Sequence, residues 1–205
     1  MIIAIDGTTS SGKGTLAKRL AGHFGLPHLD TGLLYRAVAA KALREGADVA
    51  DAETCGRLAL DLDLTDFDER ELRSSSIGAA ASVVASHGQV RRALFDMQQA
   101  FAQQPQGAVL DGRDIGTVIA PQADLKFWVD ADVVVRAGRR YRELAGMGEP
   151  VTEAQVLSQL RERDQRDSTR ADAPMKAAAD ACRIDTTAMT PDEVFAAALN
   201  AAGER

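Results

Sequence analysis

The segment IIAIDGTTSSGKGT, from Ile2 to Thr15, constrains the fold of this chain more than any other part of its sequence. An apolar run leads into Gly7, and Gly12 with Lys13 completes the G-x-x-x-x-G-K spacing of a phosphate-binding loop. Glycine lets backbone N–H groups turn inward, where they and the next helix N-terminus hold anionic phosphates. We expect Lys13 to neutralise charge on a transferring phosphoryl group. A plain Gly/Ser-rich turn is the alternative, but it explains neither the lysine nor the spacing.

The residue after the lysine departs from the usual motif. A Ser or Thr at that place commonly holds Mg²⁺, whereas this chain has Gly14 followed by Thr15. The sequence GKGT is similar to the loop of nucleoside monophosphate kinases, in which phosphates and waters hold most of the ion. The loop therefore favours a small-molecule phosphotransferase over a hydrolysing regulatory switch.

Short apolar runs alternate with stretches of helical periodicity, which predicts βα units and a parallel sheet. The expected strands are Ile2–Asp6, Pro27–Asp30, Ala108–Asp111, Leu125–Val129 and Cys182–Asp185. The expected helices are Lys13–Phe24, Gly32–Glu45, Ala52–Leu60, Glu71–Ser86, Val90–Gln103, Val133–Ala145, Glu153–Thr169 and Pro191–Ala202. The predicted class is α/β, with a P-loop NTPase core whose five-stranded parallel sheet is flanked by helices.

The order of these elements suggests one domain, 1–205, with two appended parts. The core is expected to comprise 1–30, 104–144 and 153–205, and a mostly helical lobe, 31–103, is expected at one edge of the sheet. The segment AGMGEPVT, residues 145–152, has two glycines and a proline between helices, which predicts a mobile lid.

Bulk properties limit the possible partners. The net charge is −6 and the isoelectric point about 5.1, which argues against a nucleic-acid polymer as partner because such binding needs a basic surface. The two cysteines show no metal-binding or disulfide spacing, which fits a reducing cytoplasm. No stretch resembles a signal peptide or a transmembrane helix, so we expect no membrane association, and we expect a monomer.

Polar residues follow the second and third predicted strands, at the edge where parallel sheets bind ligands. After the second strand come Thr31 and Arg36, which suit an acceptor phosphate, although Asp30 and Thr31 also fit a plain helix cap. After the third strand comes DGRD, which in isolation favours an exposed turn. Beside a phosphate-binding loop, Asp111 could orient water around Mg²⁺ and Arg113 could grip a phosphate.

Asp114 is the one direct indication of which base is bound. A carboxylate partners the N4 amino group of cytosine, whereas uracil presents an acceptor at that place.

The stretch ERDQRDSTRADAP is an unusually charged helix end. Because a helix turns about 100° per residue, four of its side chains share one face: Arg163, Arg166, Asp167 and Arg170. Charge runs on helices are usually solvated, but this arrangement in a chain with a phosphate-binding loop favours a nucleotide clamp. Arg166 is expected on the donor side. The neighbours expected to be plain surface are Arg161, Glu162 and Asp164.

Four motifs in order, IDGTTSSGKGTLAKRL, LDTGLLYRAVA, LDGRDIGTVIAP and ERDQRDSTRADAP, resemble the bacterial cytidylate kinases over nearly the whole chain. The resemblance implies a P-loop α/β core with a monophosphate-binding lobe and a lid. It also implies transfer of the γ-phosphoryl group of ATP to CMP or dCMP, with Mg²⁺.

The resemblance assigns roles residue by residue. The ATP loop is Gly7, Thr8, Thr9, Ser10, Ser11, Gly12, Lys13, Gly14 and Thr15. The implied CMP contacts are Thr31, Arg36, Ser82, Arg91, Arg113, Asp114, Arg163, Asp167 and Arg170. The implied catalytic cations are Lys13, Arg113, Arg139, Arg140 and Arg170. No side chain is implied to bind the metal directly.

Two departures from the family pattern are visible. TTSS stands where the family commonly has a proline and an extra glycine, and only TDFDER separates Leu64 from Glu71, so the lobe insert looks shortened. The alternatives that remain are a kinase for another nucleotide, shikimate or a sugar acid, a regulatory nucleotide-binding switch, and a non-catalytic binding module.

Overall fold

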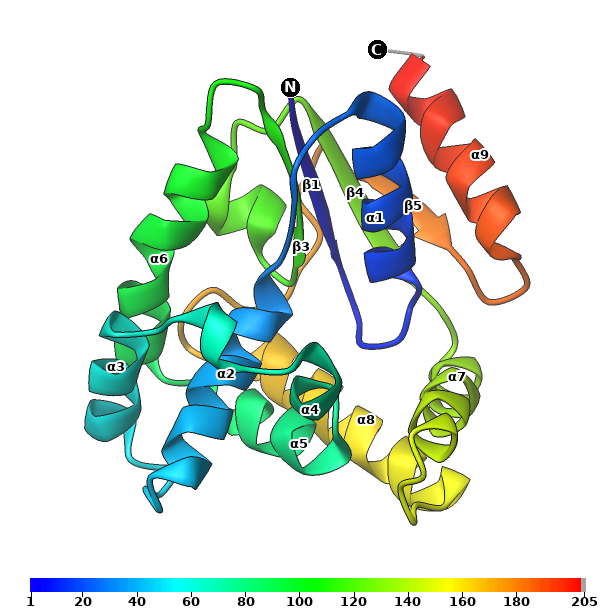
Figure 1. Ribbon diagram of the computed structural model, residues 1–205. Coiled ribbons are helices and arrows are strands. Elements are labelled where there is room, and N and C mark those ends of the chain that lie inside the picture. Colours follow the sequence, from blue (N-terminus) through cyan, green and yellow to red (C-terminus); the bar gives the residue numbers. More distant parts are fainter. Residues whose placement is uncertain (204–205) are drawn as a thin grey trace.

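The computed structural model describes residues 1–203 and is built on a five-stranded sheet, drawn in Figure 1. The strands are β1 (Ile2–Gly7), β2 (His28–Asp30), β3 (Ala108–Gly112), β4 (Leu125–Asp130) and β5 (Cys182–Asp185). Their order is β2-β3-β1-β4-β5 and every pairing is parallel. This confirms the predicted α/β class. β2 begins at His28, one residue after the predicted start, although the Pro27 carbonyl still accepts from the Val109 N–H of β3 at 2.9 Å.

Helices connect the strands. The α-helices are α1 (Lys13–Phe24), α2 (Thr31–Arg44), α3 (Ala52–Leu60), α4 (Glu69–Leu72), α5 (Ser75–Val84), α6 (Gly88–Ala102), α7 (Val133–Gly146), α8 (Glu153–Thr169) and α9 (Pro191–Gly203). Two short turns are the 3₁₀ helix η1 (Leu64–Asp66) and the π-helical η2 (Ile115–Ile119). Most predicted boundaries agree to within one or two residues.

The predicted single helix Glu71–Ser86 is wrong, because the chain forms α4 and α5 there. Ser74 begins the second helix: its hydroxyl accepts a hydrogen bond from the Ile77 N–H at 3.4 Å. Serine favours this N-cap position because its side chain competes for backbone hydrogen bonds inside a helix. The break directs Arg73 toward the carboxyl edge of the sheet, where it pairs with Asp30 at 3.2 Å.

The two faces of the sheet have separate cores. Ile3 and Ile5 of β1 pack on the face covered by α1 and α9, together with Phe127 of β4. Ala4 of β1 lies on the other face, in a cluster that includes Ile115 of η2 and residues of α6. This alternation follows from the period of two in a strand. Asp6, next on the second face, therefore points toward η2.

The carboxyl ends of β1, β3 and β4 point toward the lower half of the molecule in Figure 1, where α2–α5 and the pair α7 and α8 lie. The part around α2, α3 and α5 has its own buried cluster, including Leu34, Cys55 and Val84. A further small cluster joins α7 to α8 through Leu144 and Leu160. The division into core, lobe and lid at the predicted boundaries stays a prediction.

The predicted core segment 153–205 is described as far as Gly203, and its last two residues lie outside the described part. Across residues 1–203, no helix is both long enough and apolar enough to cross a bilayer.

Candidate active site

The loop between β1 and α1 needs glycine at its start. Gly7 has φ +152°, and a Cβ there would lie 1.9 Å from the Val129 carbonyl oxygen of the neighbouring strand. Gly12, just before α1, has φ +97°, a conformation that disfavours any side chain. The loop is braced internally by the Ser11 hydroxyl, which donates to the Thr8 carbonyl at 3.0 Å. The predicted strand–loop–helix context of the phosphate-binding motif is confirmed.

Ser10 shows what the TTSS departure means structurally. Its φ is +61°, so a serine holds the left-handed conformation that glycine ordinarily supplies. The loop therefore keeps its turn at a local energetic cost.

Lys13 and Asp111 face each other where the loop meets the end of β3. Lys13 Nζ lies 3.9 Å from Asp111 Oδ2, and only 13% of the lysine side chain is exposed. Burial, together with the nearby Arg113, lowers the pKa of Lys13 to about 8. The other carboxylate oxygen, Asp111 Oδ1, lies 2.8 Å from His28 Nε2. Thr31 is buried beside them and donates its hydroxyl to the Asp111 carbonyl at 2.9 Å.

A cavity of about 360 Å³ opens in front of this pair. Seven cationic side chains line it: Lys13, Lys18, Arg36, Arg73, Arg113, Arg140 and Arg163. Burial and the neighbouring arginines lower the pKa of Arg36 to about 9, and burial likewise lowers that of Arg163 to about 10. Cations are this crowded only where an anion can compensate them, so the cavity suits phosphate groups.

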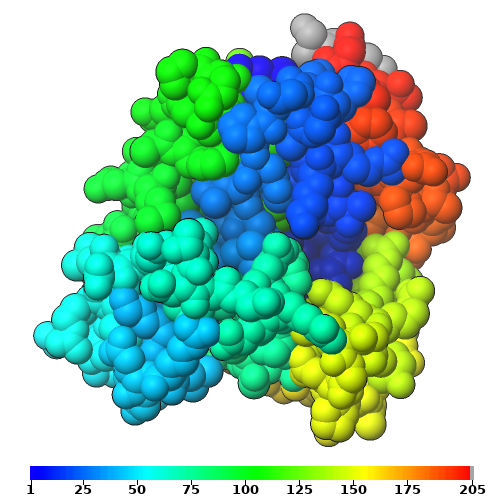
Figure 2. All heavy atoms as spheres, in the orientation of Figure 1, coloured from blue at the N-terminus to red at the C-terminus, as the bar shows by residue number. Residues whose placement is uncertain are grey.

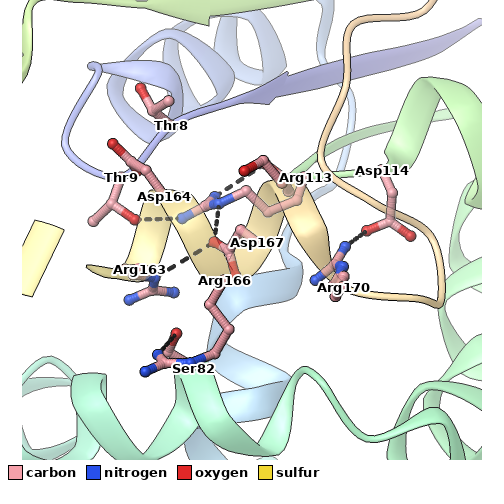
Figure 3. A network of polar contacts seen from close by, with 12 residues as sticks. Thr8, Thr9, Ser82, Arg113, Asp114, Arg163, Asp164, Arg166, Asp167 and Arg170 are labelled. Atoms are coloured by element: carbon pink, nitrogen blue, oxygen red, sulfur yellow. Dashed lines mark hydrogen bonds and ion pairs between the residues drawn. The ribbon is translucent and has the colours of Figure 1, made fainter. Parts of the chain in front are cut away.

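Arg113 connects the phosphate-binding loop to α8 (Figure 3). Its Nη2 donates to Thr9 Oγ1 at 2.7 Å, and its Nε donates to Asp167 Oδ2 at 3.2 Å. Arg163 lies 3.7 Å from the same carboxylate oxygen. Although burial alone would raise the pKa of Asp167, Arg163 and Arg113 hold it below its usual range.

Asp114 is the centre of a buried ionic cluster. Its Oδ1 accepts from Arg170 Nη2 at 3.1 Å, and its Oδ2 accepts from Arg91 Nη2. The Arg91 guanidinium also lies 5.7 Å from the centre of the Tyr35 ring. All three charged residues are at least nine-tenths buried. The structure thus brings together three of the side chains predicted to contact the acceptor, from α6, the end of β3 and the end of α8.

The predicted face of α8 is formed, and Figure 3 shows its side chains pointing toward Arg113 and Ser82. Arg166 Nη1 donates to Ser82 Oγ at 2.6 Å, so this arginine reaches α5, and its expected role on the donor side stays a prediction. A cavity of about 380 Å³ between α5 and α8 has Ser82, Arg163 and Arg166 in its wall.

The prediction that Asp164 is plain surface is wrong. Its Oδ2 accepts from Arg136 Nη2 at 2.7 Å, because α7 packs along this flank of α8. Arg161 and Glu162 are exposed, as predicted.

Arg139 and Arg140 lie on α7 but reach different places. Arg139 donates to the Thr186 hydroxyl at 2.9 Å and carbonyl at 2.7 Å, and more weakly to the Ser11 carbonyl at 3.4 Å. Arg140 donates to the Arg73 carbonyl at 2.7 Å, in the wall of the cationic cavity. The two arginines therefore flank the phosphate-binding loop on opposite sides.

A third cavity, of about 360 Å³, adjoins the outer side of the loop. Thr186 and Met189 line it together with Arg139 and Ser11. The sequence predicted no role for Thr186 and Met189, since TTAMT before α9 carries no motif. Only the parallel sheet indicates them indirectly: β5 ends at the same edge as β1, so the residues that follow β5 lie near the phosphate-binding loop.

Arg136 and Arg73 were also missed. Arg136 is buried and donates to the Ala131 carbonyl at 2.8 Å and to the Thr9 carbonyl at 3.3 Å. It shares a helix face with Arg139 and Arg140, three and four residues later, and this spacing could have found it. Arg73 adjoins the predicted acceptor arginines in the cavity wall. It lies at the break between α4 and α5, where a single continuous helix was predicted, so its position at the cavity was not expected.

Comparison with known proteins agrees with this geometry. The family model described as cytidylate kinase matches residues 3–204. The cytidylate kinase of Methylocella silvestris is 59% identical, with 97% of this chain and 92% of the relative covered. That of Xanthobacter autotrophicus is 56% identical, with 97% and 95% covered. The crystal structure of an uncharacterized protein from Eubacterium ventriosum covers 100% of this chain and 99% of its own, with a TM-score of 0.55 and 16% identity, and supports the fold alone. The chain therefore belongs to the cytidylate kinase family.

Proposed function

We propose that the cationic cavity and the Asp114 cluster together carry out the reaction of this family. In that reaction the γ-phosphoryl group of ATP is transferred to CMP or dCMP, giving ADP and CDP or dCDP. The observation that carries the assignment of the acceptor is the buried Arg91–Asp114–Arg170 cluster beside a cavity that contains Lys13.

Asp114 suits the cytosine base. A carboxylate has about four lone-pair positions, and the two arginines use one on each oxygen. The remaining positions can accept from the N4 amino group of cytosine, whereas the O4 acceptor of uracil would be repelled. Ser82 and Arg91 supply further polar groups to the same nucleotide, since each contacts a residue of the α8 face or Asp114.

The acceptor phosphate and ribose would lie between this cluster and Lys13. Arg36, Arg113 and Arg163 line that space and offer bidentate guanidinium groups to a phosphate. Asp167, held by two of these arginines, would accept from the ribose hydroxyls. Thr31 shapes this wall through its bond to the Asp111 carbonyl. Arg170 contacts Asp114 at the base end and would reach the phosphates from there.

The donor would enter from the loop side. The amides from Gly7 to Thr15 would hold the ATP phosphates, and the cavity at Thr186 and Met189 is large enough to take the adenine ring. Lys13 and Arg113 lie where the two substrates meet, and Arg139 and Arg140 flank the donor phosphates. Phosphoryl transfer depends chiefly on such positioning and charge neutralisation, so no strong base is required.

Asp111 would serve the Mg²⁺ ion that accompanies ATP. Its Oδ2 faces Lys13 at the cavity wall, while His28 and Thr31 hold the rest of the residue. A single carboxylate at this place fits an ion held mainly by phosphates and water, with Asp111 orienting a water. The ion would neutralise charge on the β- and γ-phosphates.

The decisive experiment is a coupled ADP-release assay with CMP, dCMP, UMP and AMP as acceptors. We expect ADP release that depends on the acceptor and is fastest with CMP or dCMP. In the Asp114→Asn variant the amide can no longer accept on both sides, so the preference for CMP over UMP should fall by at least about tenfold. A wild-type preference for UMP or AMP would overturn the role of Asp114. ATP turnover that is equally fast without an acceptor would overturn the kinase assignment.

Three broader parts of the proposal are separately testable. We propose a monomer, to be measured by light scattering, and a cytoplasmic location, where ATP and CMP are made and used. We also propose that the lobe, 31–103, and the lid, 145–152, close over the nucleotides and exclude water that would compete as acceptor. Scattering profiles with and without bound nucleotides would detect that closure.

A further inference from the structure

Asp6 is a buried charged side chain that the proposed reaction leaves unused. It is 3% exposed and lies directly before Gly7, at the carboxyl end of β1. Burial raises its pKa to about 7, although two backbone N–H groups and Arg113 act against that rise. A carboxyl group kept in such an environment needs a structural reason, because burying it is costly.

Its two oxygens hold the start of η2. Asp6 Oδ1 accepts from the Ile115 N–H at 2.7 Å, and Oδ2 accepts from the Gly116 N–H at 2.8 Å. These are the first N–H groups of the turn, and such groups have no partner within the turn itself. Among residues 1–203, the structure shows no ion pair to Asp6. Its bonds therefore serve the turn after β3.

Asp114 occupies the position that would ordinarily cap this turn. An aspartate at an N-cap usually accepts from the N–H groups one to three residues ahead. Asp114 makes no such bond, and its two oxygens accept instead from Arg170 and Arg91. The capping contact is instead made by a distant side chain, since Asp6 and Ile115 are 109 residues apart in the sequence.

We propose that Asp6 is a positioning residue for acceptor recognition: it caps η2 in place of Asp114 and so leaves the Asp114 carboxylate facing Arg91, Arg170 and the base. This inference rests on the proposed role of Asp114. Without Asp6, the free N–H groups of Ile115 and Gly116 compete for that carboxylate and draw it away from the base site. Because Asp6 adjoins Gly7, it also joins the donor loop to the acceptor-reading turn.

The test replaces Asp6 by asparagine, which keeps the shape but has one accepting oxygen instead of two. In Asp6→Asn, the KM for CMP should rise and the CMP:UMP ratio of kcat/KM should fall, each by about tenfold, the size expected for one lost buried hydrogen bond. The KM for ATP should change by less than about twofold, since the loop amides are untouched. Thermal unfolding of each variant is measured in parallel.

Asp124→Asn is the matched control. Asp124 is exposed, and its Oδ2 accepts from the Ile2 N–H at 2.6 Å, so it ties down the opposite end of β1. This variant should leave the CMP:UMP ratio unchanged. In an Asp114→Asn background, Asp6→Asn should cause no further loss of CMP preference, because it acts through Asp114.

The outcomes separate this inference from the function on which it rests. If Asp6→Asn unfolds at a lower temperature but keeps the wild-type KM for CMP and CMP:UMP ratio, Asp6 is purely structural and the inference is wrong. Additive losses in the double variant would also overturn it. If Asp114→Asn alone keeps the CMP preference, the base site itself is wrong. Should Asp6→Asn fail to fold, Asp6→Ser, which is smaller and keeps one accepting oxygen, is judged by the same criteria.

Discussion

At the scale of single residues, the charged form of Lys13 is destabilised in the absence of substrate. Its ammonium group is mostly buried among arginines, and its pKa falls to about 8. A phosphate group in the same space would stabilise the charged ammonium group and raise its pKa. The side chain thus trades stability of the free protein for affinity toward an anion, as functional residues often do.

Replacing Lys13 by methionine should reveal this trade. The unfolded chain has a lysine pKa near 10.5, so the folded protein binds fewer protons between about pH 8 and pH 10.5, and stability rises with pH across that window. Below about pH 8 the charged lysine costs up to about 3 kcal/mol. Lys13→Met should therefore unfold at a higher temperature than wild type at pH 7, with the difference shrinking above pH 8. The kcat should fall by at least about a hundredfold. Thermal unfolding from pH 6 to 10 checks this, and a variant less stable than wild type at pH 7 would contradict it.

Ser10 offers a second test of local strain. A serine at φ +61° costs about 1–2 kcal/mol relative to a relaxed conformation. Ser10→Gly removes that cost, and the larger entropy of glycine in the unfolded chain offsets part of the gain, leaving under about 1 kcal/mol. Ser10→Val, with a β-branched side chain, should instead be less stable by about 1–2 kcal/mol. Denaturant unfolding measures both, and a loss of stability in Ser10→Gly would refute the strain.

At the scale of elements, α8 presents two chemically different sides. Arg163 and Arg166 line the cavities, and the buried Asp167 beside them pairs with Arg163. Arg161 is exposed on the far side. Helical periodicity alone predicted this division. It did not predict Asp164, whose partner Arg136 comes from α7.

Asp167→Ala tests the substrate-facing side. The change removes the proposed acceptor for the ribose hydroxyls and releases Arg113 and Arg163 from their shared partner. We expect the KM for CMP to rise by about 10- to 100-fold, with a smaller change in the KM for ATP. Arg161→Ala, the control on the opposite side, should change neither by more than about twofold. An equal effect from Arg161→Ala would show that the two sides have been assigned incorrectly.

At the scale of the whole molecule, the segment predicted to be a lid, residues 145–152, touches the first turn of α5. Glu149 accepts hydrogen bonds from the Ser75 N–H at 3.0 Å and from its hydroxyl, at the first turn of α5. Arg140 reaches across to the Arg73 carbonyl close by. Figure 2 shows the segments of these residues meeting on the front face, below the phosphate-binding loop. These contacts hold two distant parts of the chain together over the cleft.

Glu149→Ala should weaken that closure without disturbing the chemistry. The loss of about 1 kcal/mol of contact predicts a fall of about fivefold in kcat/KM for CMP. ATP hydrolysis without acceptor should rise, because the site admits water more often. The control is Glu153→Ala, an exposed acid in the first turn of α8. Closure through this contact is excluded if Glu149→Ala matches the control in both measurements.

Much of this protein could be predicted from local patterns. The spacing of Gly7, Gly12 and Lys13, the apolar runs and the helical periodicities determined the loop, all five strands and most helices. The sequence also predicted that the polar residues after the second and third strands lie together, since parallel strands end at the same edge of the sheet. These features depend on neighbours within a few residues, so they can be predicted from the sequence.

Other features were decided only by tertiary packing. The bond from Arg166 to Ser82 joins residues 84 positions apart, and that from Asp6 to Ile115 joins residues 109 apart. The sequence indicated Asp114 as a base contact but not its partners: Arg91 and Arg170 are brought beside it only by the packing of α6 and α8. The sequence thus determined which residues could bind phosphate and base. The fold determined which partner each one faces, because a side chain's hydrogen bonds depend on where packing places the rest of the chain.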